Sequence, residues 1–184
     1  MRTKGWLLVL LALVFAACAG EEPAEAEPAA EPAAAEPAAE PTADDQVAAM
    51  QADCEAAAEA IAARQAESSL YDRLGGRDAI EGVVTEVVRL HHENEAIAHL
   101  FAEADDATLI ASVTDYLAEV AGGDVTYAGG GMVEVHTGMN ITNELFLAAG
   151  GDVHAAMTAA GIGENEIEEV MCHFASKHGE VVGI

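Results

Sequence analysis

All five prolines of this 184-residue chain lie within residues 23–41, and none follows in the rest of the sequence. Proline removes a backbone donor and disfavours helix at the residue before it. Residues 18–43, rich in proline, alanine and glutamate, are therefore predicted to form an extended tether without a fold of their own. After the last proline, long helices are permitted throughout the chain.

The first residues resemble an export signal. Arg2 and Lys4 precede an apolar run at residues 6–17. That run is short for a bilayer span but suits the hydrophobic region of a signal peptide, predicted here as residues 1–17. The chain is therefore expected to leave the cytoplasm for the cell envelope, on the periplasmic or outer-membrane face.

Small residues before Cys18 resemble a bacterial lipobox, although Phe15 stands where leucine is usual. Two hypotheses remain open: lipidation of Cys18, which anchors the protein in the membrane, or ordinary cleavage after Ala19. The tether favours the lipid anchor, because a folded domain must stand clear of the membrane surface.

Charge excludes one class of partner. The chain has 33 acidic residues against seven Lys and Arg, a formal net charge of -26. Nucleic acids and anionic membrane surfaces would be repelled by such a protein. Aromatic residues make up 4% of the sequence, which suits small-residue helices better than a β-sandwich.

Residues 44–68 are predicted to form an additional helix because they are rich in alanine and glutamate. This segment contains Cys54, and the only other cysteine beyond the tether is Cys172. An oxidising compartment favours a disulfide that joins this helix to the C-terminal one. The alternative is two buried free thiols.

Residues 69–184 are predicted to be a single all-α domain. Asp78 and Glu81 resemble a capping box, and Asp105 or Asp106 is placed to cap a later helix. No stretch alternates as a strand would. Apolar residues recur at helical spacing in four segments: Ile80, Val83, Val84, Val87, Val88 and His91; Leu109, Val113, Tyr116, Leu117 and Val120; Phe146, Ala149, Val153 and Met157; and Ile167, Val170, Met171 and Phe174.

A glycine-rich loop at residues 122–131 leads to a short segment that carries one imidazole, His136. Glycines allow the backbone to approach a flat ligand closely, and a histidine can bind a metal through one ring nitrogen while the other is held by a hydrogen bond. A surface histidine in a plain helical bundle is the alternative.

Four motifs together resemble the group I truncated haemoglobins. They are SLYDRLGG at 69–76, HLF at 99–101, GG-x-x-x-Y-x-G-x-x-M at 122–132 and H-x-x-M-x-I-T at 136–142. The resemblance implies a two-over-two helical sandwich that binds haem b, with His136 as the proximal ligand of the iron. It places Phe101 against the porphyrin and Met132 beside it as a packing residue.

The opposite side of the haem departs from the family. Val88 stands where a distal tyrosine is usual, and Leu109 and Val113 stand where a polar group is often found. A polar donor there stabilises bound dioxygen, and losing such a hydrogen bond costs about 1.5–3 kcal/mol. We therefore expect weaker retention of dioxygen, with carbon monoxide or nitric oxide binding less affected.

Three further points follow from the resemblance. His178 lies close to the place where some relatives bond a histidine to a haem vinyl group. The sequence contains no C-x-x-C-H for ordinary covalent attachment. Arg77, Arg89 and Lys177 are the cations available for the haem propionates, which otherwise face water.

The predicted function is reversible binding of a diatomic gas, O2, NO or CO, at haem iron in the cell envelope. Two alternatives stay open: a haem-dependent redox enzyme that detoxifies NO or peroxide, and a haem-free globin fold that serves as an interaction module. The sequence does not decide whether the protein is an enzyme, and it makes no prediction of oligomeric state.

Overall fold

The computed structural model describes residues 40–184, which contain helices and no strand. The predicted signal peptide, most of the tether and Cys18 lie outside these residues. The elements are α1 (Ala43–Glu67), α2 (Leu70–Leu74), α3 (Arg77–Glu93), the 3-10 helix η1 (Ala98–Leu100), α4 (Asp106–Val120), α5 (Met132–His136), α6 (Asn143–Ala159), α7 (Glu164–Ser176) and α8 (His178–Val181).

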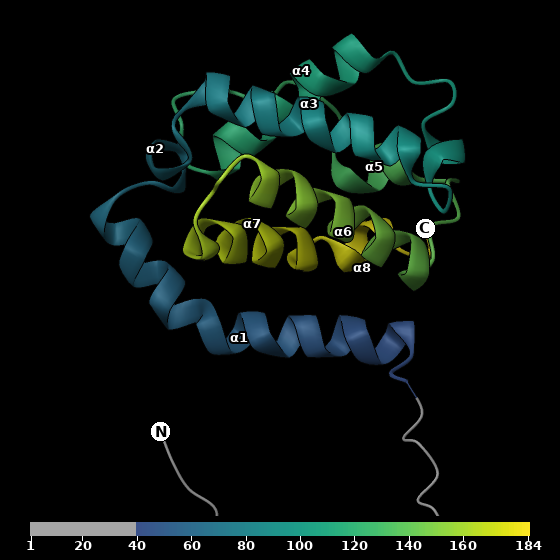
Figure 1. The fold of residues 1–184 in the computed structure, drawn as a ribbon, viewed down its shortest axis with the longest axis horizontal. Coiled ribbons are helices and arrows are strands. Elements are labelled where there is room, and N and C mark those ends of the chain that lie inside the picture. The colour runs from purple at the N-terminus through teal and green to yellow at the C-terminus, as the bar shows by residue number, and fades with distance from the viewer. Residues whose placement is uncertain (1–39) are drawn as a thin grey trace, which may run out of the picture. The chain divides into compact units, whose positions relative to one another are not determined.

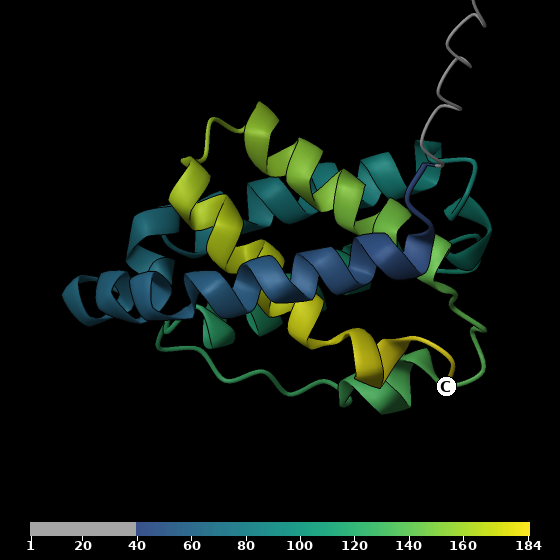
Figure 2. The same ribbon diagram turned by 90° about the horizontal axis from the view of Figure 1, so that it is seen from below.

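The helices form a two-over-two sandwich, as the sequence predicts. Helices α3 and α4 pack as one pair, and α6 and α7 lie beneath them as the other (Figure 1). Helix α1 lies outside this sandwich, against α7 and α6 (Figure 2). None of the described helices is both long enough and apolar enough to cross a bilayer.

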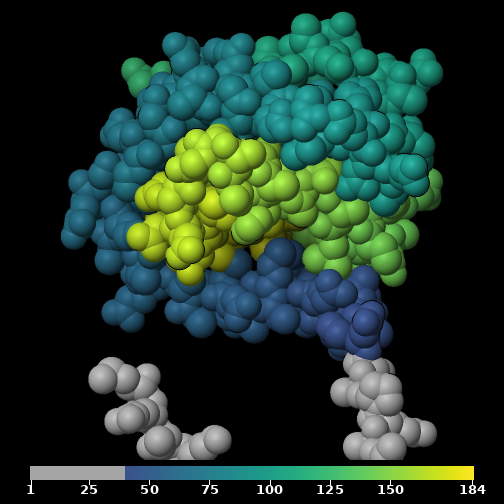
Figure 3. Space-filling view, viewed as in Figure 1, coloured from purple at the N-terminus to yellow at the C-terminus, as the bar shows by residue number. Residues whose placement is uncertain are grey.

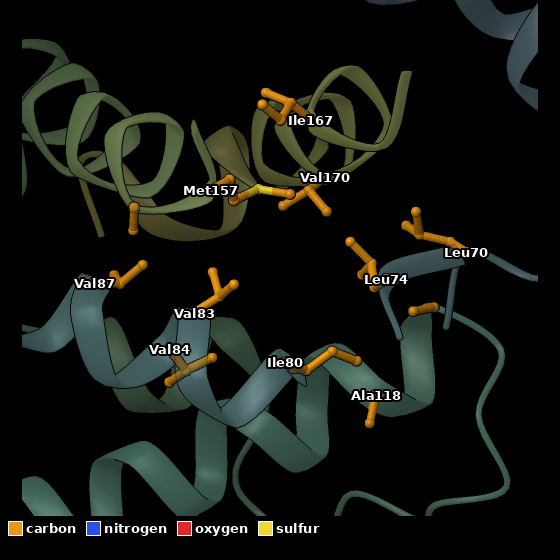
Figure 4. Close-up of a cluster of buried hydrophobic side chains, with 12 residues drawn as sticks. Leu70, Leu74, Ile80, Val83, Val84, Val87, Ala118, Met157, Ile167 and Val170 are labelled. Carbon is orange, nitrogen blue, oxygen red and sulfur yellow. The ribbon is translucent and has the colours of Figure 1, made fainter. Parts of the chain in front are cut away.

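Side chains from both helix pairs meet in the main core. Val83 and Val87 of α3 point toward Met157 of α6 and Val170 of α7 (Figure 4). Gly150 allows α6 to approach α7, because an added Cβ would lie 3.0 Å from Phe174 Cε1. Close packing at Gly150 thus offsets the low helix propensity of the Gly150-Gly151 pair.

Local signals explain several helix ends. Thr42 and Asp45 form a capping box at the start of α1, and Asp105 caps α4 by accepting from Thr108 N. The predicted capping box of Asp78 and Glu81 is wrong. The N-cap of α3 lies two residues earlier, at Gly76, whose φ of 81° follows the left-handed end of α2, so the helix begins at Arg77.

Helix α1 is held along its length. Val47 near its start is buried in a second apolar cluster with Ile141, Phe146 and Val181. Asp44 accepts a hydrogen bond from Asn143 at 2.6 Å. In Figure 3, α1 runs as a blue band along the edge of the green and yellow surface of α6 and α7.

Candidate functional site

His136 is the last residue of α5, and its Nδ1 lies 2.8 Å from the carbonyl oxygen of Met132. A carbonyl only accepts, so Nδ1 is the donor, and in the neutral ring Nε2 carries the lone pair. Within residues 40–184, that Nε2 makes no hydrogen bond. A histidine held at one nitrogen and open at the other has the arrangement of a metal ligand.

Two features fix α5 in place. The preceding loop needs a glycine at position 130, because a Cβ on Gly130 would lie 2.9 Å from Cγ1 of Val135. On the other side, Gly138 N donates to the carbonyl of Ile184 at 3.3 Å, which ties the segment to the C-terminus. Helix α5 also packs against α8.

Several valines around His136 and on α4 are unusually exposed for their type. Val133 and Val135 of α5 are 50% and 47% exposed, and Val113 of α4 is 36% exposed. Leu109 lies one turn before Val113 and is half-buried. The exposed valines of α5 lie next to one open imidazole, which fits a flat apolar cofactor that takes a single nitrogen ligand.

Val88 and Phe101 have different surroundings. Val88 is 4% exposed on α3, which packs against α4. Phe101 follows η1 and is half-buried, with its ring stacked on His91 at 4.8 Å between centroids. His91 is itself held by Asp152, whose Oδ2 lies 2.8 Å from Nδ1.

The pKa of His91, whose ring stacks on Phe101, is shifted by its burial and by Asp152. Burial lowers the pKa of His91, and the hydrogen bond that its Nδ1 donates to the Asp152 carboxylate opposes that shift without cancelling it. Asn94 donates to both oxygens of Asp152, each at 3.1 Å. The ring beneath Phe101 is therefore held by a fixed carboxylate.

The structure thus groups the predicted residues in four places. Leu109 and Val113 share one face of α4, while Met132 and His136 are joined by a hydrogen bond on α5. Val88 is packed into the interior and Phe101 lies on His91. The two cysteines, Cys54 and Cys172, form a disulfide with their Cα atoms 5.3 Å apart.

The cations expected to meet propionates are all engaged elsewhere. Arg77 pairs with Glu81 and Asp115, and Arg89 pairs with Glu86 and Glu93. Lys177 pairs with Glu180 at 3.0 Å. Arg64 and Arg73, the other cations of the described segment, are paired as well. Propionates at this site would therefore face water.

His178 has a partner that the sequence did not indicate. Its Nε2 lies 2.6 Å from Oδ1 of Asn143, and its ring stands edge-on to Phe146. An amide oxygen only accepts, so Nε2 is the protonated nitrogen. The nitrogen is thus occupied within the protein, and covalent attachment there stays a prediction.

Sequence reasoning missed one polar pair that involves the α4 face of Leu109 and Val113. The hydroxyl of Tyr116 on α4 lies 2.6 Å from Nε2 of His173 on α7. Tyr116 follows Leu109 and Val113 at helical spacing, which is the signal that places it on their face. Its partner is 57 residues away, and no local pattern identifies it.

Comparison with known proteins gives the family. A family model for bacterial-like globins matches residues 69–181. The chain is 32% identical over 109 residues to a group 1 truncated haemoglobin of Mycolicibacterium paratuberculosis, covering 59% of this chain and 80% of that protein. It is 30% identical over 101 residues to one from Tetrahymena pyriformis, covering 55% and 84%.

Solved structures agree with this match. The Fe(III) form of the truncated haemoglobin from Tetrahymena pyriformis superposes with a TM-score of 0.61 at 26% identity, covering 64% of this chain and all of that one. The 2/2 haemoglobin of Synechococcus sp. PCC 7002, in its cyanomet state with covalently attached haem, shares the fold at a TM-score of 0.56, with 20% identity over 61% of this chain and 94% of that one. This chain belongs to the bacterial-like globin family and groups with the group 1 truncated haemoglobins.

Proposed function

We propose that this protein binds haem b through His136 and reversibly binds a diatomic gas, and that it is anchored in the bacterial cell envelope. The observation that carries the proposal is the hydrogen bond from His136 Nδ1 to the Met132 carbonyl, which leaves Nε2 available to iron. The names of its relatives as haemoglobins support the same function.

When bound, haem would supply an iron that can take a small gas. The residues of this chain do the rest. His136 would hold the iron, while Leu109 and Val113 would present an apolar face that excludes water and offers no donor to the gas. Phe101 packs on the porphyrin, supported from behind by His91. The absence of a C-x-x-C-H sequence supports haem b.

Spectroscopy of residues 40–184 reconstituted with haem tests this assignment. We expect wild type to show a Soret band that shifts when carbon monoxide is added to the ferrous protein. In His136→Ala, both the band and its shift should be altered or lost. His154→Ala is the matched control, because His154 is exposed on α6. Unchanged spectra in His136→Ala would rule out His136 as the proximal ligand. A wild type without a Soret band would favour the haem-free interaction module.

The envelope anchor needs a separate test because Cys18 lies outside the described residues. We expect mass spectrometry of the full-length protein, extracted from bacterial membranes, to find a lipid on Cys18. Cys18→Ala should release the protein from the membrane fraction. A wild-type chain that begins after Ala19 without lipid would contradict the anchor and support ordinary export.

One observation favours a second function, the haem-dependent redox enzyme. Tyr116, which is hydrogen-bonded to His173 of α7, lies on the same face of α4 as Leu109 and Val113. Such a pair has no role in simple gas binding, but it suits transfer of an electron together with a proton.

A further inference from the structure

The first turns of α1 and the residues that follow His136 belong to the same apolar cluster. Val47 of α1 is buried there with Ile141 and Val181, and Met139 packs against them. Met139 N donates a hydrogen bond to the carbonyl oxygen of His136 at 3.1 Å. Figures 1 and 2 show the start of α1 at the same end of the domain as the C-terminus. The added helix therefore reaches the segment that carries the predicted iron ligand.

A hydrogen-bond chain joins the same end of α1 to α8. Asn143, the first residue of α6, donates from Nδ2 to Asp44 Oδ1 of α1 at 2.6 Å. Its Oδ1 lies 2.6 Å from Nε2 of His178, the first residue of α8. A carboxylate only accepts, so Asp44 fixes the direction in which the Asn143 amide faces, and His178 Nε2 is the donor. One side chain thus links three helices.

Helix α8 and the residues after it hold the segment that follows His136. Helix α8 packs against α5. Beyond α8, Gly183 N donates to the carbonyl oxygen of Ile141 at 3.1 Å, and Gly138 N donates to that of Ile184 at 3.3 Å. Because these main-chain bonds fasten the segment to the C-terminal residues, a shift of α8 would also shift the backbone next to His136.

The rest of α1 is fixed to α7 by separate contacts. Cys54 is bonded to Cys172, and Arg64 pairs with Glu169. Cys54 lies ten residues beyond Asp44, which is about 15 Å along a helix. Since α1 is anchored near its middle and near its end, its first turn is held in place against α6.

We infer that α1 braces the haem site, with Asn143 as the positioning residue that passes the position of α1 to α8 and so to His136. This inference rests on the proposed haem binding. The family match covers residues 69–181, so α1 lies outside it, and the inference gives this helix a role in haem retention. A ligand whose backbone is held in one position loses less freedom on binding, so it should release haem more slowly.

Haem release from the full-length protein to an excess of apomyoglobin tests the brace. Asn143→Ala removes both bonds of the chain, while alanine raises the intrinsic helix propensity of α6. We expect the variant to release haem about fivefold faster, which corresponds to one net hydrogen bond. The iron–histidine stretching band of the ferrous protein in resonance Raman spectra should also shift. A release rate equal to that of wild type would overturn the inference.

Asp44 provides a matched pair of variants. Asp44→Ala and Asp44→Asn remove the same charge from the first turn of α1, but asparagine keeps an oxygen that can accept from Asn143 Nδ2. We expect faster haem release in Asp44→Ala and a rate close to wild type in Asp44→Asn. Equal acceleration in both variants would assign the effect to charge and contradict the hydrogen-bond chain.

A further measurement does not depend on haem. In the haem-free protein, hydrogen exchange at the amides of residues 133–139 should be faster in Asn143→Ala than in wild type, while exchange in α3 stays the same. An equal rise in α3 would indicate general destabilisation and would overturn the inference, as would equal exchange at residues 133–139 in the two proteins. Failure of haem binding alone would refute the proposed function and leave this difference intact.

Discussion

Arg73 Nη2 donates to Glu169 Oε2 at 2.7 Å, which joins α2 to α7 through a carboxylate whose side chain is 1% exposed. The other oxygen of Glu169 accepts from Arg64 Nε of α1, also at 2.7 Å. A buried carboxylate is tolerated only when its charge and lone pairs are matched in this way. The added helix is thus tied to the globin domain through one buried acid.

Replacing Glu169 with glutamine should lower the free energy of unfolding by about 2 kcal/mol, because charge-assisted hydrogen bonds to both arginines are weakened. Urea unfolding of residues 40–184 followed by circular dichroism measures the change. Glu168→Gln is the control: Glu168 also pairs with Arg64 but is 43% exposed, so its loss should cost under about 1 kcal/mol. Equal losses in both variants would contradict a special role for the buried acid.

The contribution of Glu169 should also depend on pH. Burial alone would raise the pKa of Glu169, but hydrogen bonds from Arg73, Arg64 and Gln65 outweigh it and lower the pKa. A lowered folded pKa gives stability that is full above the unfolded pKa of about 4.3 and is lost as pH falls through the folded value. The difference between wild type and Glu169→Gln should therefore persist from neutral pH to about pH 5 and shrink in stronger acid. A stability difference that grows in acid would contradict the lowered pKa of Glu169.

The disulfide should be a larger source of stability than any single ion pair. Cys54 and Cys172 are 118 residues apart, so their bond closes a long loop in the unfolded chain. Loss of a native disulfide typically costs about 2–5 kcal/mol. In urea unfolding, we expect the free energy of unfolding of the Cys54→Ala/Cys172→Ala variant to be lower than that of wild type by that amount.

Reduction provides the control for this prediction. Dithiothreitol should destabilise the wild type and leave the double alanine variant unchanged. Thiol titration of denatured, unreduced residues 40–184 should find no free thiol. Two free thiols in protein purified from the envelope would show that the bond does not form there.

Sequence periodicity predicted the helices but not how α1 attaches to them. The stripe of α3 predicts its buried face because Ile80, Val84 and their neighbours are large and regularly spaced. The stripe of α1 is thin, and only Val47 of that helix is buried. Its remaining attachment depends on Arg64 and Cys54, whose partners lie over a hundred residues away. Periodicity indicates which face is apolar, not which helix it meets.

In the candidate site too, contacts between residues close in the sequence were predictable and contacts between distant residues were not. The hydrogen bond from His136 to Met132 joins residues four apart, so a short helix at this position is enough to produce it. The bond between Tyr116 and His173 requires two helices to cross at a particular place. Pattern reasoning identifies the first residue of that pair and has no means of finding the second.

Salt should stabilise this protein. Each arginine and lysine of residues 40–184 already pairs with a carboxylate, and the net charge of the whole chain is -26. The remaining carboxylates repel one another, and salt screens that repulsion over about 10 Å at 0.1 M. Thermal unfolding should therefore shift upward as sodium chloride is raised from low to molar concentration. A steady fall in Tm would mean that the ion pairs outweigh the repulsion.

Introducing a donor at Val88 tests the distal side of the proposed haem site. In Val88→Tyr, a phenol hydroxyl near the gas should strengthen dioxygen binding by about 1.5–3 kcal/mol, and about 1.4 kcal/mol corresponds to a tenfold change in affinity. Because Val88 is 4% exposed, a larger ring should also destabilise the fold by about 1–3 kcal/mol. Val88→Phe carries the same ring without the hydroxyl and is the matched control. Stopped-flow measurement should show slower dioxygen dissociation in Val88→Tyr than in Val88→Phe, with similar carbon monoxide binding in both. Equal dioxygen dissociation in the two variants would mean that residue 88 does not face the gas.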